Sequence, residues 1–196
     1  MADQLALFPD SPPASVPEGL VFIPDAICAA TERALERRID AAPLTPFQFG
    51  QWEAKRLTAN YGSAYDYQRA RPISAPTMPD WLVDLRNALA PAFGLSPEAF
   101  VQGLAIRYDP GAGIGWHRDR PQYGQVIGLS LSTPATIRFR RRRADGAFDR
   151  RPVLLPPRSA YLLDGPARTD WQHSIAPMTA TRRSVTFRTL RNGAPF

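Results

Sequence analysis

Three side chains in this sequence could together hold a transition metal: two histidines and one aspartate. His117 and Asp119 lie two positions apart in the segment GIGWHRDRPQYG, and His173 lies further along the chain in DWQHSIAP. These are the only histidines in the sequence. On a strand, residues two positions apart point the same way, so His117 and Asp119 would face one cavity. Two imidazoles and one carboxylate on one side of a metal leave the opposite coordination positions open for reacting molecules.

A strand with two arginines on one face follows His173. The segment RRSVTFR places Arg182, Ser184, Thr186 and Arg188 at even spacing, with apolar residues between them. One face of this strand would pack between layers, while the polar face would look into a cavity. Buried guanidiniums are unfavourable unless they meet anions, and arginine binds carboxylates through two parallel hydrogen bonds. A dicarboxylate cosubstrate would satisfy both, and an open two-His, one-carboxylate site is typical of non-heme Fe(II) oxygenases.

Other interpretations of the same residues are possible. Both histidines could be ordinary surface or core residues. Zinc could occupy such a triad, but a zinc hydrolase would have no use for the paired arginines. The segment GAGIG at 111–115 superficially resembles a nucleotide-binding loop. Its spacing is wrong and no helix follows it, so it indicates a turn into the metal-binding strand.

The residues after position 100 are typical of short strands separated by turns. Seven segments are rich in β-branched and aromatic residues, are too short for typical helices and are punctuated by Gly and Pro. They are VQGLAIRY, QVIGLSLS, ATIRFRR, PVLL, SAYLL, WQHSIA and SVTFRTL. Such spacing predicts a β-sandwich or jelly roll.

Two helices are expected before these strands. The first would open at Pro24-Asp25, with Asp25 as its N-cap, and would contain Cys28 as a small buried hydrophobe. The second would follow Pro79-Asp80, with its apolar face formed by Leu82, Leu85 and Leu89. The helices would cover one outer face of the strands, which gives an α+β fold with a β-sandwich core.

The composition fits one domain with a short tail. A chain of 196 residues with 44% hydrophobic content can bury a sizeable core. Residues 1–17 are rich in proline and serine and predict a disordered tail, which leaves 18–196 as a single domain. No basic segment followed by an apolar run opens the chain, so a soluble cytoplasmic protein without a membrane partner is expected.

The charge of the chain has two interpretations. A net charge of +6 favours an anionic partner such as nucleic acid. However, Lys55 is the only lysine, and 21 prolines accompany the many arginines and alanines. This composition is also typical of a genome-wide bias, so the charge alone leaves both interpretations open.

Taken together, these motifs resemble the AlkB family of 2-oxoglutarate- and Fe(II)-dependent dioxygenases. The likeness rests on RYDPGAGIGWHRD, VIGLSLSTPATIRFR, LPPRSAYLLDGPARTDWQHSIAP and RRSVTFRTL, and it covers residues 55–190. It implies a monomer with a double-stranded β-helix (jelly-roll) core and flanking helices that cover one sheet. It also implies Fe(II) as cofactor, with 2-oxoglutarate and O₂ as cosubstrates.

The resemblance also implies roles for single residues. His117, Asp119 and His173 would be the catalytic iron ligands. Tyr108 would hydrogen-bond the cosubstrate, Arg182 would bind its distal carboxylate, and Arg188 would lie near the carboxylate that chelates the metal.

The sequence departs from the family at two positions. Ile106 stands where many members have an asparagine that contacts the cosubstrate. Pro121 stands where the bacterial repair enzyme has a second acidic residue that helps to recognise the damaged base. The resemblance therefore says more about the iron chemistry than about the choice of base.

The implied reaction is the oxidative dealkylation of N-alkylated bases in nucleic acid, as DNA or RNA repair or demethylation. Candidate substrate contacts are the aromatic and basic residues of a lid segment and of the metal strand: Arg56, Tyr61, Tyr65, Tyr67, Trp116, Arg118 and Arg120. The tyrosines could stack on a base extruded from its strand, or they could simply pack in a hairpin. The alternatives are the same chemistry on a protein side chain or small metabolite, and a binding module without turnover.

One further motif lies in the tail. The pentapeptide QLALF, with Gln4, Leu5, Leu7 and Phe8 as its contact residues, is similar to the segment by which bacterial repair proteins bind the DNA sliding clamp. On a flexible tail, it could dock into an apolar pocket while the domain stays tethered. The alternative is a tail with incidental apolar residues.

Overall fold

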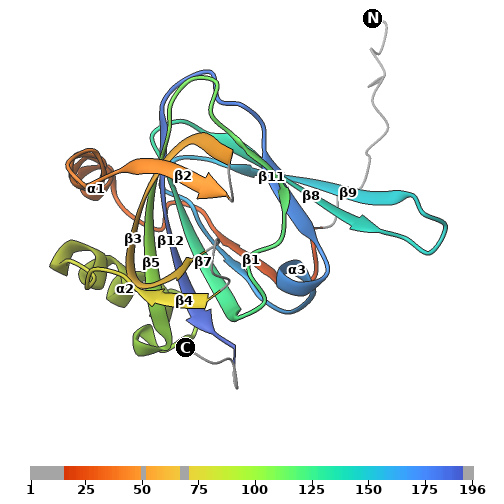
Figure 1. Ribbon diagram of the computed structural model, residues 1–196, viewed down its shortest axis with the longest axis horizontal. Helices are drawn as coiled ribbons and strands as arrows, with labels where there is room; N and C mark the ends of the chain where they lie inside the picture. The colour runs from red at the N-terminus through yellow and green to blue at the C-terminus, as the bar shows by residue number, and fades with distance from the viewer. Residues whose placement is uncertain (1–15, 50–51, 67–70, 192–196) are drawn as a thin grey trace, which may run out of the picture.

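The computed structural model describes residues 16–49, 52–66 and 71–191 (Figure 1). The elements before the first predicted strand are β1 (Leu20–Ile23), α1 (Ala29–Asp40), β2 (Thr45–Phe49), β3 (Trp52–Asp66), β4 (Arg71–Ser74), α2 (Asp80–Ala92) and η1 (Pro97–Ala99). They are followed by β5 (Phe100–Tyr108), β6 (Ile114–His117), β7 (Tyr123–Leu131), β8 (Ala135–Arg142), β9 (Phe148–Leu155), β10 (Ala160–Leu163), α3 (Gly165–Thr169), β11 (Gln172–Ile175) and β12 (Arg182–Leu190).

The strands form two antiparallel sheets. The larger has the order β1-β10-β7-β12-β5-β3-β2, with β4 paired to β3, and the smaller has the order β6-β11-β8-β9. From β5 onward the chain passes repeatedly between the sheets, as in a jelly roll. The structure therefore confirms the predicted double-stranded β-helix core.

The hydrophobic core between the sheets follows from the alternation of side chains along each strand. On β8, Ala135, Ile137 and Phe139 are buried, whereas Thr136 and Arg138 are exposed. The buried set packs against apolar residues of the larger sheet. The smaller sheet thus has one face in the core and one face outward.

Helices α1 and α2 cover the opposite face of the larger sheet (Figure 1). Leu82, Leu85 and Leu89 of α2 are buried in a second cluster with Val185 and Phe187 of β12. This confirms the predicted apolar face of the second helix and the predicted covering of one sheet. Strand β12 is therefore buried on both sides, with helices on one side and the smaller sheet on the other.

The start of the first helix differs from the prediction. Helix α1 begins at Ala29 with Cys28 as N-cap, and the Cys28 side chain is exposed rather than buried. Asp25 lies in a turn with a φ of 46°, after the edge strand β1. A strand of only four residues gives little periodicity, so the sequence did not distinguish it from the helix that follows.

Part of the sequence-based description lies outside the described residues. The predicted tail over 1–17 is described only at Val16 and Pro17, where the Pro17 carbonyl accepts a hydrogen bond from the Leu20 amide. The QLALF motif lies wholly outside, so binding to a sliding clamp stays a prediction. Among the described residues, no helix is both long and apolar enough to cross a membrane.

Candidate metal centre

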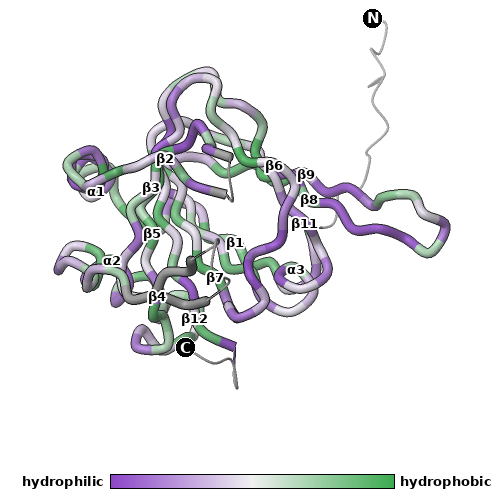
Figure 2. Tube along the Cα trace, in the orientation of Figure 1, coloured by the Kyte–Doolittle hydropathy of each residue, from purple (hydrophilic) through white to green (hydrophobic). Residues whose placement is uncertain are grey.

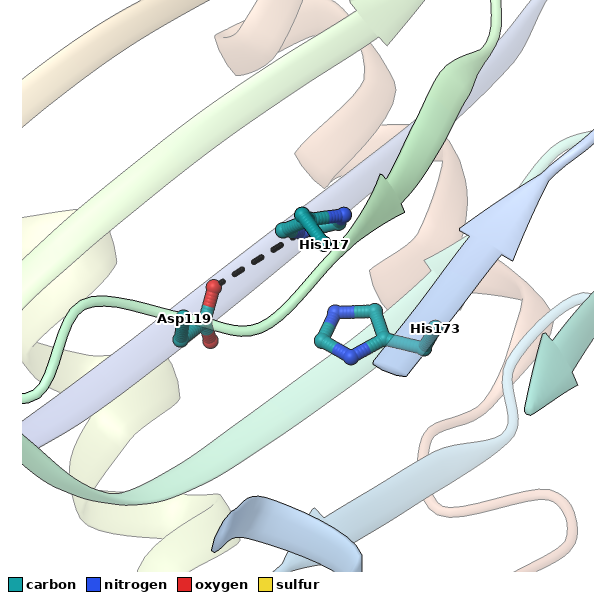
Figure 3. Close-up of side chains that lie close together, drawn as sticks. All are labelled: His117, Asp119 and His173. Atoms are coloured by element: carbon teal, nitrogen blue, oxygen red, sulfur yellow. Dashed lines mark ion pairs between the residues drawn. The ribbon is translucent and has the colours of Figure 1, made fainter. Parts of the chain in front are cut away.

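His117, Asp119 and His173 come together on the inner side of the smaller sheet (Figure 3). His117 ends β6 and lies opposite His173 of β11 in the antiparallel register, with the ring centroids 4.2 Å apart. Asp119 follows β6, and its Oδ1 lies 3.9 Å from Nε2 of His117. The potential ligand atoms of the three residues all lie within 4.8 Å of one another, so a single ion could contact all of them.

A close approach at Gly113 allows β6 to pair with β11. A Cβ at this position would lie 2.8 Å from the carbonyl oxygen of Ile175 and 2.9 Å from the nitrogen of Pro177. Only glycine avoids these contacts. The GAGIG segment is thus a turn into the metal-binding strand, as the sequence indicated.

One hydrogen bond selects the nitrogen that His117 offers to a metal. Nδ1 of His117 lies 2.9 Å from the carbonyl oxygen of Gly115. Because a carbonyl only accepts, Nδ1 must donate, and the lone pair of Nε2 remains available. Hydrogen bonds of this kind commonly fix the orientation of metal-binding histidines.

The environment holds all three side chains in the protonation state that binds metals. Burial, with a smaller contribution from the neighbouring His117, lowers the pKa of His173 to about 3. Burial also lowers the pKa of His117, although Asp119 partly opposes this. Burial raises the pKa of Asp119, but Arg188 and the two imidazoles outweigh that effect, so the pKa lies well below its usual value. Near neutral pH the site presents two neutral imidazoles and one carboxylate.

Arg188 holds the Asp119 carboxylate in place. Its Nε donates to Oδ2 of Asp119 at 3.2 Å and its Nη2 to Oδ1 at 3.4 Å. Its Nη1 donates to Gln102 at 3.1 Å and to Thr186 at 3.0 Å. Arg188 therefore contacts the carboxylate of Asp119, one of the three candidate metal ligands, and its expected place near the cosubstrate carboxylate stays a prediction. The sequence did not single out Gln102, although a glutamine within the apolar run VQGLAIRY is a usable signal.

Arg182 is a buried cation with unused hydrogen-bond donors. The residue is 1% exposed, and its Nη2 donates to Oγ of Ser130 at 3.2 Å. Its Nε and Nη1 have no hydrogen-bond partner among the described residues. Tyr108 lies opposite in the register, with its ring centroid 5.2 Å from the guanidinium carbon. Buried donors without acceptors indicate a missing ligand, and a carboxylate matches a guanidinium in shape and charge.

A cavity of about 360 Å³ connects Arg182 to the triad. The evenly spaced polar residues of β12 line it, together with Tyr108 and a largely apolar wall: Leu104, Ile106, Val126, Ile137, Leu163 and Ile175. This volume and lining are typical of small-molecule sites. Ile106 is buried in the wall opposite Ser184, so an apolar side chain occupies the place of the family asparagine.

Tyr161 also lines the cavity, although the sequence did not single it out. It lies opposite Gly128 on β7, where an added Cβ would stand 2.2 Å from Cζ of the tyrosine. Burial raises the pKa of Tyr161 to about 12, so its hydroxyl keeps the proton. The signal in the sequence was the glycine inside the strand QVIGLSLS, because such a glycine often marks a close approach.

The loop that carries Asp119 is anchored from behind by Arg168. This arginine is 5% exposed, and its Nη2 donates to the carbonyl oxygens of Arg120 and Tyr123, the latter at 2.7 Å. Arg168 thereby fixes the chain between the metal ligand and the start of β7.

The structure brings four of the candidate substrate contacts to this cavity. Arg56, Trp116, Arg118 and Arg120 all line it. The Arg56 guanidinium lies over the Phe47 ring at 4.0 Å, and Arg118 donates to the carbonyl oxygen of Asp170 at 2.9 Å.

The structure contradicts a substrate contact by Tyr61. This side chain is 7% exposed and packs in the cluster between the larger sheet and the helices. Because side chains alternate along a strand, Arg56 and Tyr61 fall on opposite faces of β3. Tyr65 lies on β3 and Tyr67 lies outside the described residues, so contacts by these two tyrosines stay predictions.

Comparisons with known proteins agree with this geometry. Residues 24–192 match the 2OG-Fe(II) oxygenase superfamily. A Xenopus tropicalis protein named tRNA (carboxymethyluridine(34)-5-O)-methyltransferase alkbh8 is 30% identical over 166 residues, which are 83% of this chain and 26% of that protein. An Arabidopsis thaliana protein named Alkylated DNA repair protein ALKBH8 homolog is 27% identical over 181 residues, 80% of this chain and 50% of that protein. The chain thus spans only a quarter to a half of the length of these curated relatives.

The fold is shared with a solved AlkB homologue. The structure of OsALKBH1 superposes with a TM-score of 0.69 at 14% identity and covers 89% of this chain and 98% of its own. The superfamily uses Fe(II), 2-oxoglutarate and O₂, and the triad together with the unused donors of Arg182 fits that set of ligands. The chain belongs to the 2OG-Fe(II) oxygenase superfamily.

Proposed function

We propose that this protein oxidatively dealkylates N-alkylated bases in DNA or RNA. The observation that carries the proposal is the position of three arginines on the solvent side of the cavity. Arg56 and Arg120 are half-buried and Arg118 is exposed, whereas Arg182 is 1% exposed. Arginines around the entrance of a site attract and position phosphates. The name of the Arabidopsis relative, which refers to alkylated DNA repair, gives further support.

In this proposal each part of the cavity has its own task. His117, Asp119 and His173 would hold Fe(II), which together with O₂ and 2-oxoglutarate supplies the oxidation of a C–H bond. Arg182 would bind the distal carboxylate of 2-oxoglutarate, with Tyr108 beside it. Arg188 would keep Asp119 in place, and the apolar wall would exclude water.

The substrate must bring an alkyl carbon close to the metal. A base inside a duplex cannot do so, so the base must be unpaired or extruded from its strand. Hydroxylation of an N-methyl group gives a product that breaks down to formaldehyde and the unmodified base. Trp116 and Arg120 line the cavity, and in this proposal they would contact the base or its phosphate as it enters.

Binding of the metal and cosubstrate is tested by absorption spectroscopy. Anaerobic addition of Fe(II) and 2-oxoglutarate is expected to give a visible charge-transfer band, and His117→Ala or Asp119→Ala should abolish it. The matched control is Asp145→Ala, since Asp145 is an exposed aspartate on the β8–β9 hairpin. Absence of a band in the wild-type protein would contradict a working metal centre.

The substrate class is tested by product formation. Oligonucleotides that contain 1-methyladenine, 3-methylcytosine or N6-methyladenine are incubated with the holoenzyme, and formaldehyde and succinate are measured. We expect matched formaldehyde and succinate on at least one oligonucleotide. Succinate without formaldehyde on every oligonucleotide would contradict the proposal.

That contrary result would favour the same chemistry on a protein side chain or small metabolite. Two observations keep this second candidate open. Pro121 replaces the acidic residue used for base recognition in the bacterial repair enzyme, and Tyr61 is absent from the cavity wall.

A further inference from the structure

The outward face of the smaller sheet carries a group of arginines, which we call the arginine face: Arg138, Arg140 and Arg142 of β8 and Arg150 of β9. Arg140 and Arg150 are opposite each other in the register. Residues opposite each other in an antiparallel pair point to the same side, and so do alternate residues of one strand. The four side chains therefore share one face, which is the face directed away from the core.

Two aromatic residues are interleaved with these arginines. The Arg140 guanidinium carbon lies 4.4 Å from the ring centroid of Trp116 and 4.8 Å from that of Phe148. Arg138 lies 5.3 Å from Trp116, and Arg150 lies 5.6 Å from Phe148. Stacking uses the flat face of a guanidinium and leaves its in-plane N–H donors able to bind other groups.

The arginine face has no carboxylate partner among the residues that the structure describes. Arg138 donates to the Ser174 hydroxyl at 3.1 Å and Arg140 to the Gln172 side-chain oxygen at 2.8 Å, and both acceptors are uncharged. Among the described residues, no carboxylate lies within 4.0 Å of any of the four guanidiniums. Like charges gathered without counter-charges favour an anionic partner.

Neighbouring arginines of the same hairpin provide a contrast. Arg141 pairs with Asp149 at 3.4 Å, and Arg143 pairs with Asp145 at 2.8 Å. Arg141 lies between Arg140 and Arg142 on β8, so its side chain points to the opposite face of the sheet. Arg151 also lies on the inner side of this hairpin without an ion pair among the described residues, so the four outward arginines carry most, but not all, of the unneutralised charge.

The arginine face is continuous with the cavity. Trp116 contacts Arg138 and Arg140, lines the cavity and precedes the metal ligand His117 in sequence. From there the face continues along the β8–β9 hairpin, which projects from the body of the protein (Figure 1) and is largely hydrophilic (Figure 2). A polymer with one unit in the cavity could thus continue onto this face without leaving the protein surface.

We propose that the arginine face binds the single-stranded stretch of nucleic acid that flanks the base in the cavity. Its arginines would contact successive phosphates, and Trp116 would mark the entrance to the cavity. A cationic surface with interleaved aromatic rings is the chemistry that binds single strands without sequence preference. The inference rests on the proposed function for its substrate class, and it adds the surface that holds the flanking strand.

The test is a triple variant, R138Q/R142Q/R150Q, compared with R33Q/R37Q/R38Q on helix α1. Both sets of arginines include only exposed residues, and both variants remove three positive charges. Arg140 is left unchanged because it is half-buried and lies against both Trp116 and Phe148. Binding of a fluorescent oligothymidine of about 20 nucleotides is measured by anisotropy from about 50 to 200 mM salt, the range in which phosphate contacts dominate.

Each phosphate contact contributes about −0.7 to the slope of log K against log salt for a single strand. We therefore expect the R138Q/R142Q/R150Q variant to bind more weakly than wild type and to have a slope shallower by about 2. The α1 variant should keep the wild-type slope. An unchanged slope in the first variant, or an equal loss in both, would overturn the inference.

Further arms separate this inference from the proposed function. The Fe(II) and 2-oxoglutarate band should persist in the triple variant. If the band is lost, the single exposed substitution Arg142→Gln takes the place of the triple variant, with an expected slope change of about 0.7.

If the enzyme dealkylates oligonucleotides but the slope is insensitive to the arginine face, only this inference fails. If the salt dependence of binding depends on the arginine face but no oligonucleotide is dealkylated, the proposed function is wrong. The inference that the arginine face binds nucleic acid then remains supported. Binding of poly-glutamate but not oligothymidine would overturn the nucleic-acid assignment.

Discussion

Arg182 and Arg188 lie on the same face of β12, but their guanidinium groups have different partners. Arg188 meets Asp119, Gln102 and Thr186 within the protein. Arg182 has only the Ser130 hydroxyl, and its Nε and Nη1 remain without partners among the described residues. Arg182 is therefore a buried cation with unused donors, and the proposed function assigns a carboxylate of the cosubstrate to them.

This difference leads to a prediction for Arg182→Met. Loss of the guanidinium should weaken 2-oxoglutarate binding by at least about 30-fold, since losing one partner of a buried charge pair removes roughly 2–5 kcal/mol. In the absence of 2-oxoglutarate, the variant should be as stable as wild type or more stable by about 1 kcal/mol, because donors without partners are removed. Calorimetric titration and urea unfolding measure the two effects. Arg182→Lys, which keeps the charge but not the two parallel hydrogen bonds, should give intermediate affinity. Unchanged affinity in Arg182→Met would contradict the assigned role.

The low pKa of His173 predicts a pH dependence of stability for the metal-free protein. Its pKa is about 3 in the folded state, against an ordinary value of 6.5. Between these values the unfolded chain binds more protons, so the free energy of unfolding should decrease as the pH falls below 6.5. The lowered pKa of Asp119 contributes stability that is lost only as the pH falls below its ordinary value of 3.8. The range between pH 4 and 6.5 therefore reports mainly on the histidines.

We expect unfolding to require about 1–2 kcal/mol less at about pH 5 than at pH 7. Urea titrations in the presence of a chelator measure this difference. The His173→Gln variant should lose a large part of it, with His117 responsible for the remainder. Equal pH dependence in wild type and variant would show that burial of the imidazole does not control its protonation.

At the scale of elements, the cavity depends on two places where a glycine lets a neighbouring part of the chain come very close. Gly113 lets β6 pair with β11, and Gly128 leaves room for the ring of Tyr161 between β7 and β10. The close contact at Gly113 brings the imidazoles of His117 and His173 together. The close contact at Gly128 sets the shape of the cavity wall.

Gly128→Ala is therefore expected to destabilise the protein and to disturb the cavity. The added Cβ would overlap the Tyr161 ring at 2.2 Å, and overpacking of this kind lowers the free energy of unfolding by about 1–3 kcal/mol. Displacement of the ring should also weaken 2-oxoglutarate binding. Denaturant unfolding measures the stability change, and the same substitution in a Tyr161→Leu background is the control. A similar loss in both backgrounds would show that the ring contact is not the cause.

At the scale of the whole molecule, the two sheets supply different halves of the site. The smaller sheet brings His117 and His173, and the larger brings Arg182, Arg188 and Tyr108. A metal with its cosubstrate would therefore connect the two sheets across the cavity. Ligands of this kind bind only the folded state and so stabilise it.

We expect Mn(II) together with 2-oxoglutarate to raise the Tm of the protein. At a concentration about 100 times the Kd the stabilisation is about 2.7 kcal/mol, which corresponds to roughly 5–10 °C for a chain of this size. Thermal unfolding by circular dichroism measures the shift, and a chelator should reverse it. In Arg182→Met, the effect of Mn(II) alone should remain while the increment from 2-oxoglutarate is lost. An equal increment in wild type and variant would show that the larger sheet does not hold the cosubstrate.

Local patterns were sufficient to predict much of this protein. Short segments rich in β-branched and aromatic residues between Gly and Pro predicted the strands after residue 100, and the spacing of Leu82, Leu85 and Leu89 predicted α2. The evenly spaced Arg182 and Arg188 do face one cavity, because alternation along a strand is a property of the backbone itself. The two histidines and one aspartate already suggested that His117 and Asp119 join the distant His173, and the family resemblance supported this grouping.

Other features depend on which strands become neighbours and in which register. The position of Tyr61 in the core, the contact of Arg188 with Asp119 and the stacking of Arg140 on Trp116 all join separate elements. A shift of one residue in register moves every side chain of a strand to the opposite face. Local sequence limits each strand to two faces, but only the packing of helices and sheets decides which face meets the metal, the core or the solvent.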